Sequence, residues 1–125
     1  MNPSSVLSGG STGQELSQDE ELARHALGVM NEVLSVAPKA LGKPLPASLP
    51  TPDQVLQSIS RNGSGSKPSM WADWERGSPM ELEVILGNPI RLARELGLEM
   101  PRVQSMYALL KMAQRKRKGT LDSKL

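Results

Sequence analysis

The segment Ser69–Glu81, with the sequence SMWADWERGSPME, constrains the fold of this chain more than any other stretch. Met70 and Trp74 stand four positions apart, which places them on one face of a helix. Gly77 is expected to end that helix. The residues Ser78–Glu81 then have the spacing of a capping box, with proline at the first helical position. The segment therefore predicts two helices joined by a tight turn.

The apolar residues elsewhere recur at spacings of three and four, and they do not alternate with polar residues over any long stretch. This pattern predicts an all-α fold. A first helix is expected from Ser17, which forms an S-x-x-E box with Glu20, to about Val36. Pro38 is expected to end it, and Lys39–Pro50 to form an extended, proline-rich connector.

Besides the helix at Ser69, three helices are expected after the connector. One begins at the Thr51 cap, and one runs from Ser78 to about Leu96 with a kink at Gly87 and Pro89. The inward residues of that helix are expected to be Leu82, Ile85, Leu86, Pro89, Leu92, Ala93 and Leu96. The last helix begins at Pro101 and is expected to dissolve after Gly119.

The composition of the two chain ends predicts the domain limits. Residues 1–13 are rich in serine and glycine and are expected to be disordered. Residues 14–118 are expected to form one helical domain, followed by a flexible tail over 119–125.

Several function classes are disfavoured by composition. The chain has no cysteine and one histidine, His25, so no metal site is expected. It has no apolar run of transmembrane length and no signal-type start, so we expect a cytoplasmic protein that does not bind membranes. The net charge is +2, and the basic run Arg115–Lys118 is interpreted as compensation of a helix dipole rather than as a nucleic-acid site.

The stretch Pro68–Gln114 resembles the C-terminal domain of ketopantoate reductase (2-dehydropantoate 2-reductase), particularly its fungal relatives. The resemblance depends on an ordered set of residues: Ser69, Met70, Asp73, Gly77, Glu81, Gly87, Arg91, Gly97 and Pro101. It implies a helical domain of the 6-phosphogluconate dehydrogenase C-terminal-like type. In the family this domain packs against an N-terminal Rossmann domain and closes over NADPH and a 2-keto acid, whose ketone is reduced.

The resemblance also implies site residues. The family position at Ser69 hydrogen-bonds the substrate, and the position at Glu81 lies at the catalytic centre. Asp73 belongs to the same motif, and Ser66 replaces an asparagine usual in the family, so both are candidate substrate contacts. The family's catalytic lysine has no match on the first predicted helix. Read without the resemblance, Glu81 is a capping residue and Asp73 a surface partner of Arg76.

Nothing in residues 1–13 can form the strand, G-x-G-x-x-G turn and helix that place a dinucleotide. We therefore expect a domain truncated at its first helix, which binds NADPH only when a Rossmann domain completes it. Two functions remain. One is a substrate-binding or dimerisation domain related to 2-keto acid reduction, in pantothenate biosynthesis or secondary metabolism, with a Rossmann-domain protein or itself as partner. The other is a non-catalytic binding or oligomerisation module.

Overall fold

The computed structural model describes residues 2–62 and 69–123. Every regular element in these two ranges is helical, which confirms the predicted all-α class. The α-helices are α1 (Asn2–Leu7), α2 (Gly13–Gln18), α3 (Glu20–Leu41), α4 (Pro52–Asn62), α5 (Ser69–Arg76), α6 (Asn88–Glu95) and α7 (Pro101–Ser123). A π-helical turn, η1 (Glu83–Gly87), directly precedes α6.

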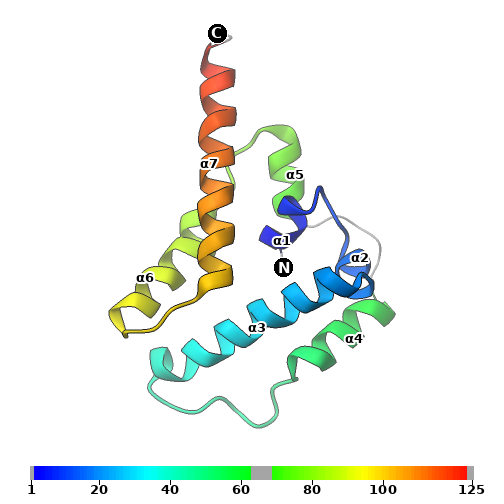
Figure 1. Cartoon of the computed structure of the whole chain (residues 1–125), viewed down its shortest axis with the longest axis vertical. Helices are drawn as coiled ribbons and strands as arrows, with labels where there is room; N and C mark the ends of the chain where they lie inside the picture. Colours follow the sequence, from blue (N-terminus) through cyan, green and yellow to red (C-terminus); the bar gives the residue numbers. More distant parts are fainter. Residues whose placement is uncertain (1, 63–68, 124–125) are drawn as a thin grey trace.

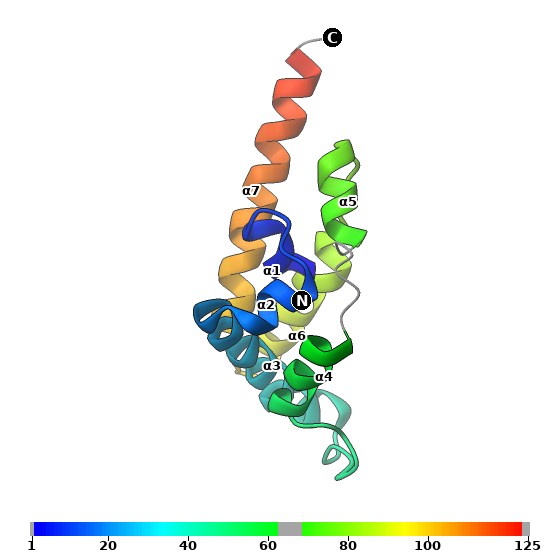
Figure 2. The ribbon, with the colours of Figure 1, turned by 90° about the vertical axis from the view of Figure 1, so that its right-hand side faces the viewer.

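The long helices α3 and α7 set the frame of the molecule (Figure 1). They pack against each other, and the short helix α1 lies in the angle between α7 and α5. Helices α2 and α4 pack together at the amino-terminal half of α3, whereas α6 lies on the other side, near the carboxyl-terminal half of α3. Seen from the side, the carboxyl-terminal part of α7 rises beyond the other helices (Figure 2). The segment that carries the predicted site residues, α5 and the turn after it, therefore packs against α1 and is hydrogen-bonded to α7 through Arg117.

The main core lies where η1, α6 and α7 meet α5 and the end of α3. Its buried apolar members are Val6, Val36, Met70, Met80, Leu82, Leu86, Ile90, Ala93, Met100, Val103, Met106 and Leu110. Four of these are methionines, whose flexible thioether chains fill irregular spaces between helices. A second buried group, which holds α2 and α4 to α3, includes Leu16, Ala26 and Leu56.

Residues 2–13 form a helix and a buried turn, where disorder was predicted. Ser4 and Ser5 are buried in α1. The hydroxyl of Ser5 donates to the carbonyl of Ser11, and the hydroxyl of Ser8 donates to the carbonyl of Ser4 at 2.8 Å. Serine is a poor helix former, but here its hydroxyls satisfy buried backbone carbonyls and allow close packing. Composition alone therefore misled the prediction.

The first predicted helix is two helices. Thr12 caps α2 in a capping box with Glu15: the Glu15 amide donates to the Thr12 hydroxyl at 3.2 Å, and the Thr12 amide to the Glu15 carboxylate at 3.1 Å. Asp19 then caps α3 by accepting from the Leu22 amide at 2.9 Å. The predicted cap at Ser17 is wrong, because its hydroxyl donates to the carbonyl of Gln14.

The predicted end of this helix at Pro38 is also wrong. Pro38 lies inside α3, which continues to Leu41. The proline removes only one hydrogen bond near the helix end, whereas Gly42 adopts a φ of +71° and closes the helix with a left-handed turn. The connector is therefore shorter than predicted. The capped start at Thr51 is confirmed by reciprocal hydrogen bonds with Gln54.

At the other end, α7 passes through Gly119 and continues to Ser123, so the predicted tail from residue 119 is helical over residues 119–123. A single glycine costs a helix only about 1 kcal/mol relative to alanine, which does not force an end.

Candidate active site

Helix α5 and the turn after it form the first part of the site. Ser69 is the first residue of α5, and Gly77, with φ +75°, ends the helix as predicted. The Asp73 carbonyl accepts from the Ser78 amide at 2.8 Å, which closes the turn. The Asp73 carboxylate lies 2.7 Å from the Arg76 guanidinium. Asp73 is therefore occupied by a local ion pair.

The carboxyl end of α5 is fixed to α7 by Arg117. Its guanidinium lies 4.4 Å from the centre of the Trp74 ring and donates to the carbonyl of Trp74 and, at 3.3 Å, to that of Glu75. The Trp74 carbonyl also accepts from the Gly77 amide at 3.1 Å, and the negative end of the helix dipole favours a cation here. Arg117, one member of the basic run, thus serves the end of α5 and not, as the sequence suggested, the end of its own helix.

Glu81 lies in the short link between this turn and η1, and its side chain is exposed. Its neighbours Met80 and Leu82 are each 4% exposed, so both flanking side chains anchor in the core. The Met80 amide also donates to the side-chain oxygen of Gln114 at 2.7 Å, and the Glu81 carbonyl accepts from the Ile85 amide at 3.1 Å. The backbone of Glu81 is therefore held from both sides while its carboxylate points outward.

The capping box predicted for Ser78 and Glu81 is not formed. The backbone turns helical only at Leu82, and no hydrogen bond or ion pair between the described residues engages the Glu81 carboxylate. The reciprocal bonds with Ser78, on which the capping interpretation of Glu81 depended, are therefore not present among the described residues.

Glu83, two residues later, has the opposite environment. Its carboxylate accepts from the Tyr107 hydroxyl at 2.6 Å and lies 3.0 Å from the Arg91 guanidinium, which also donates to Asn88 at 2.6 Å. The hydrogen bond from Tyr107, and then that from Arg91, lower the pKa of the Glu83 carboxyl. Gly87 lies beneath this network: a Cβ there would stand 2.4 Å from the Glu83 carboxylate.

The π-helical turn explains the predicted kink. The Asn88 amide donates to the Glu83 carbonyl five residues back, and Pro89 follows at once. Pro89 has no amide hydrogen and cannot donate a helical hydrogen bond. It follows the π-helical turn directly, where the regular i to i−4 hydrogen bonds of the helix are already interrupted. The predicted inward positions of this helix are correct for Leu82, Leu86 and Ala93. They are wrong for Ile85, Leu92 and Leu96, which are 39%, 42% and 39% exposed.

Two further contacts had no signal in the sequence. The Glu32 carboxylate, on α3, accepts from the backbone amides of Arg102 at 2.8 Å and Val103 at 3.1 Å, and so caps α7 from 70 residues away. His25 lies 2.9 Å from the Ser4 hydroxyl, which also donates to the sulfur of Met106. Burial first, and Arg102 second, lower the pKa of His25. Both contacts join helices remote in sequence, so no local pattern announces them.

The four predicted site residues therefore have different environments in the structure. The backbone of Glu81 is held while none of the described residues engages its carboxylate, and Asp73 is paired with Arg76. Ser69 begins α5, while Ser66 lies outside the described residues. Among the residues that the structure describes, no cluster of three or more His, Cys, Asp or Glu side chains could hold a metal ion. In the same ranges, no helix is long and apolar enough to cross a membrane.

Residues 1–114 match the model of the family described as ketopantoate reductase PanE/ApbA C terminal. The chain belongs to this family. The match includes both Ser69 and Glu81, and it extends the predicted resemblance, which began at Pro68, to the start of the chain.

Individual relatives agree with this assignment. A 2-dehydropantoate 2-reductase of Nostoc sp. is 32% identical over 111 residues, which are 84% of this chain and 34% of that protein. An uncharacterized protein of Saccharomyces cerevisiae is 53% identical over 58 residues, 44% of this chain and 16% of its own length. The crystal structure of 2-dehydropantoate 2-reductase from Methylococcus capsulatus superposes with a TM-score of 0.79 at 35% identity, over 94% of this chain and 36% of that one. The chain thus spans about a third of the length of two of these relatives.

Proposed function

We propose that this chain is the substrate-facing helical part of a ketopantoate reductase-type site, which acts on a 2-keto acid when a Rossmann domain supplies NADPH. The single observation that carries the proposal is the environment of Glu81. Its backbone is fixed by the buried Met80 and Leu82, while its carboxylate is exposed and unengaged by the described residues. A carboxylate held in this way is pre-organised for a ligand.

NADPH, if held by the completing Rossmann domain, would supply a hydride for the carbonyl carbon of the keto acid, and with a proton on the carbonyl oxygen the products would be the 2-hydroxy acid and NADP⁺. Glu81 accepts a hydrogen bond from the substrate's polar groups and fixes its orientation. Ser69, at the first turn of α5, hydrogen-bonds the same substrate, with Asp73 and Ser66 as secondary candidates. The chain provides no identified lysine for the proton, so that group comes from the completing polypeptide.

The test is reconstitution. The part of the Methylococcus capsulatus reductase that this chain does not match is mixed with the chain, and NADPH absorbance is followed after addition of ketopantoate. We expect turnover, and we expect Glu81→Gln to lower it about 10²-fold or more, the usual scale for a group that orients or transfers protons. Glu99→Gln is the matched control, since Glu99 is also an exposed carboxylate, in the loop before α7. Full turnover by Glu81→Gln contradicts the assigned role.

A non-catalytic binding or oligomerisation module is the second candidate, and one observation favours it. A large apolar surface between α3 and α6 is left open by the described residues. On this proposal the reconstituted mixture shows no turnover, and the surface alone accounts for the chain's role.

A further inference from the structure

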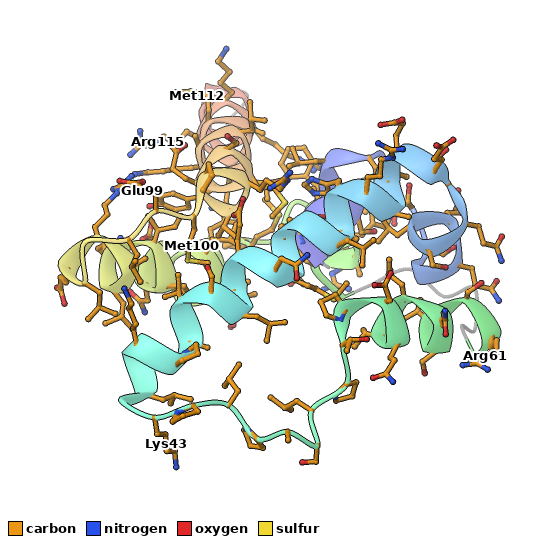
Figure 3. All side chains as sticks on the ribbon, turned by 60° about the horizontal axis from the view of Figure 1, so that its bottom comes forward. Lys43, Arg61, Glu99, Met100, Met112 and Arg115 are labelled. Carbon is orange, nitrogen blue, oxygen red and sulfur yellow. The ribbon has the colours of Figure 1, made fainter. Side chains whose placement is uncertain are left out.

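One face of α7 contacts the backbone on both sides of the turn that follows α5. Before the turn, Arg117 donates to two backbone carbonyls at the end of α5. After it, the side-chain oxygen of Gln114 accepts from the Met80 amide at 2.7 Å. Residues three apart lie on the same face of a helix, and the exposed side chains of Met112 and Arg115 lie on the opposite face, at the outer edge of the molecule (Figure 3). The inner face of α7 therefore fixes where α5 ends relative to where the next segment begins.

This arrangement bears on the candidate site because the turn separates two of its residues. Ser69 begins α5, and Glu81 directly follows Met80. The link between the turn and η1 belongs to no helix, so the position of Glu81 depends on individual contacts. Pro79 has no amide hydrogen, and the Met80 amide is therefore the first donor after Ser78 that can fix this link.

The hydrogen bond from Met80 to Gln114 is directional, whereas the packing of the Met80 side chain is not. That side chain is buried, but a methionine has three rotatable bonds and fills cavities of several shapes. A hydrogen bond restricts both the distance and the angle at which the amide meets its acceptor. The orientation of this amide sets the direction in which the chain enters Glu81. Gln114 thus acts on the Glu81 carboxylate through the backbone.

We propose that Gln114 is a positioning residue, which fixes the Glu81 carboxylate relative to Ser69 through the Met80 amide. The proposal deepens the proposed function and rests on it, because the placement of Glu81 affects turnover only if Glu81 binds the substrate. It gives the carboxyl-terminal part of α7 a role in the site, although none of the predicted site residues lies on that helix.

Three variants of the full chain test the proposal. Gln114→Met keeps the length and helix propensity of the side chain but removes its carbonyl oxygen, whereas Gln114→Glu keeps an oxygen acceptor. Gln104→Met is the matched control, since it makes the same change near the start of α7, away from the turn. Circular dichroism checks that all three variants keep the wild-type helix content.

The first measurement is hydrogen exchange of the Met80 amide, followed by NMR on the chain alone. We expect exchange about tenfold faster in Gln114→Met, because loss of one hydrogen bond weakens local protection. Gln114→Glu and Gln104→Met should exchange at close to the wild-type rate. A wild-type rate in Gln114→Met overturns the proposal. Since this measurement needs no turnover, failure of the proposed function leaves it interpretable.

The second measurement is turnover in the mixture reconstituted with the rest of the Methylococcus capsulatus reductase. We expect Gln114→Met to lower kcat/KM about tenfold and Gln114→Glu to restore most of the loss. The double variant of Gln114→Met and Glu81→Gln should be no slower than Glu81→Gln alone, because Gln114 acts only through that carboxylate.

Two results in the mixture overturn the proposal: full turnover by Gln114→Met, or a further tenfold loss when this change is added to Glu81→Gln. The second result would show that Gln114 acts independently of Glu81. Absence of turnover with the wild-type chain instead overturns the proposed function and, with it, the role of Gln114 in turnover. The exchange rates then still decide whether Gln114 fixes the backbone at Met80.

Discussion

Glu81 and Glu83 are two residues apart and differ in what their carboxylates bind. Glu83 is bound by Tyr107 and Arg91 within the chain, whereas the Glu81 carboxylate is engaged by none of the described residues. Apolar side chains show a similar contrast: those of the core are buried by other residues of the chain, whereas those between α3 and α6 are partly exposed. Groups that the chain satisfies itself maintain the fold, and we expect the groups that it leaves open to serve a partner or a ligand.

The largest effect on stability is expected at Glu32, the most buried of the engaged carboxylates, with its side chain 10% exposed. Glu32→Ala leaves the amides of Arg102 and Val103 without their acceptor at the start of α7. We expect a loss of about 1–3 kcal/mol in the free energy of unfolding, measured by urea denaturation. Glu99→Ala, which removes an exposed carboxylate, should stay within about 0.5 kcal/mol of wild type. Equal losses from the two variants would show that the cap contributes nothing.

A smaller effect is expected at Arg117, which binds the end of α5. Arg117→Ala removes the contact with the Trp74 ring and two hydrogen bonds to backbone carbonyls. Together these are expected to contribute about 1 kcal/mol. Arg115→Ala, two residues earlier on the exposed side of α7, is the matched control and should be nearly neutral. If both variants unfold alike in urea, the basic run only compensates the dipole of its own helix.

The pH dependence gives a third comparison. Because burial lowers the pKa of His25 in the folded chain, the unfolded chain binds the proton more readily. Stability is therefore complete above the unfolded pKa of about 6.5 and declines as the pH falls below it. His25→Asn should reduce this slope in denaturation curves between about pH 7 and pH 5. A slope that is unchanged in the variant would contradict the assignment.

These comparisons also show which parts of the molecule could be predicted. The turn at Gly77, the Thr51 cap and the kink before α6 follow from glycine, proline and capping residues a few positions apart, and these were predicted correctly. Helix α1 was missed because Ser4 is satisfied by His25 of α3 and Met106 of α7, and Ser5 by the Ser11 carbonyl, contacts that composition alone does not reveal. The predicted helix end at Pro38 was wrong because a proline near the end of a helix removes only one hydrogen bond, and α3 continues to its cap at Gly42.

The candidate site also has a part that the sequence predicted and a part that it could not predict. The motif predicted Glu81 as a site residue, and the structure adds that Met80 and Leu82 anchor its backbone while none of the described residues engages its carboxylate. The hydrogen bond from Tyr107 to Glu83 and the cap that Glu32 gives to α7 could not be predicted, because the partners lie 24 and 70 residues apart.

The most direct test of the contrast compares Glu81→Gln with Glu83→Gln in one experiment. Both are isosteric, and each is measured for the free energy of unfolding and for NADPH turnover in the reconstituted mixture. We predict that Glu81→Gln abolishes most turnover and leaves stability unchanged, while Glu83→Gln lowers stability by a few tenths of a kcal/mol and retains most turnover. The reverse pattern, with turnover lost at Glu83 and kept at Glu81, would contradict the account.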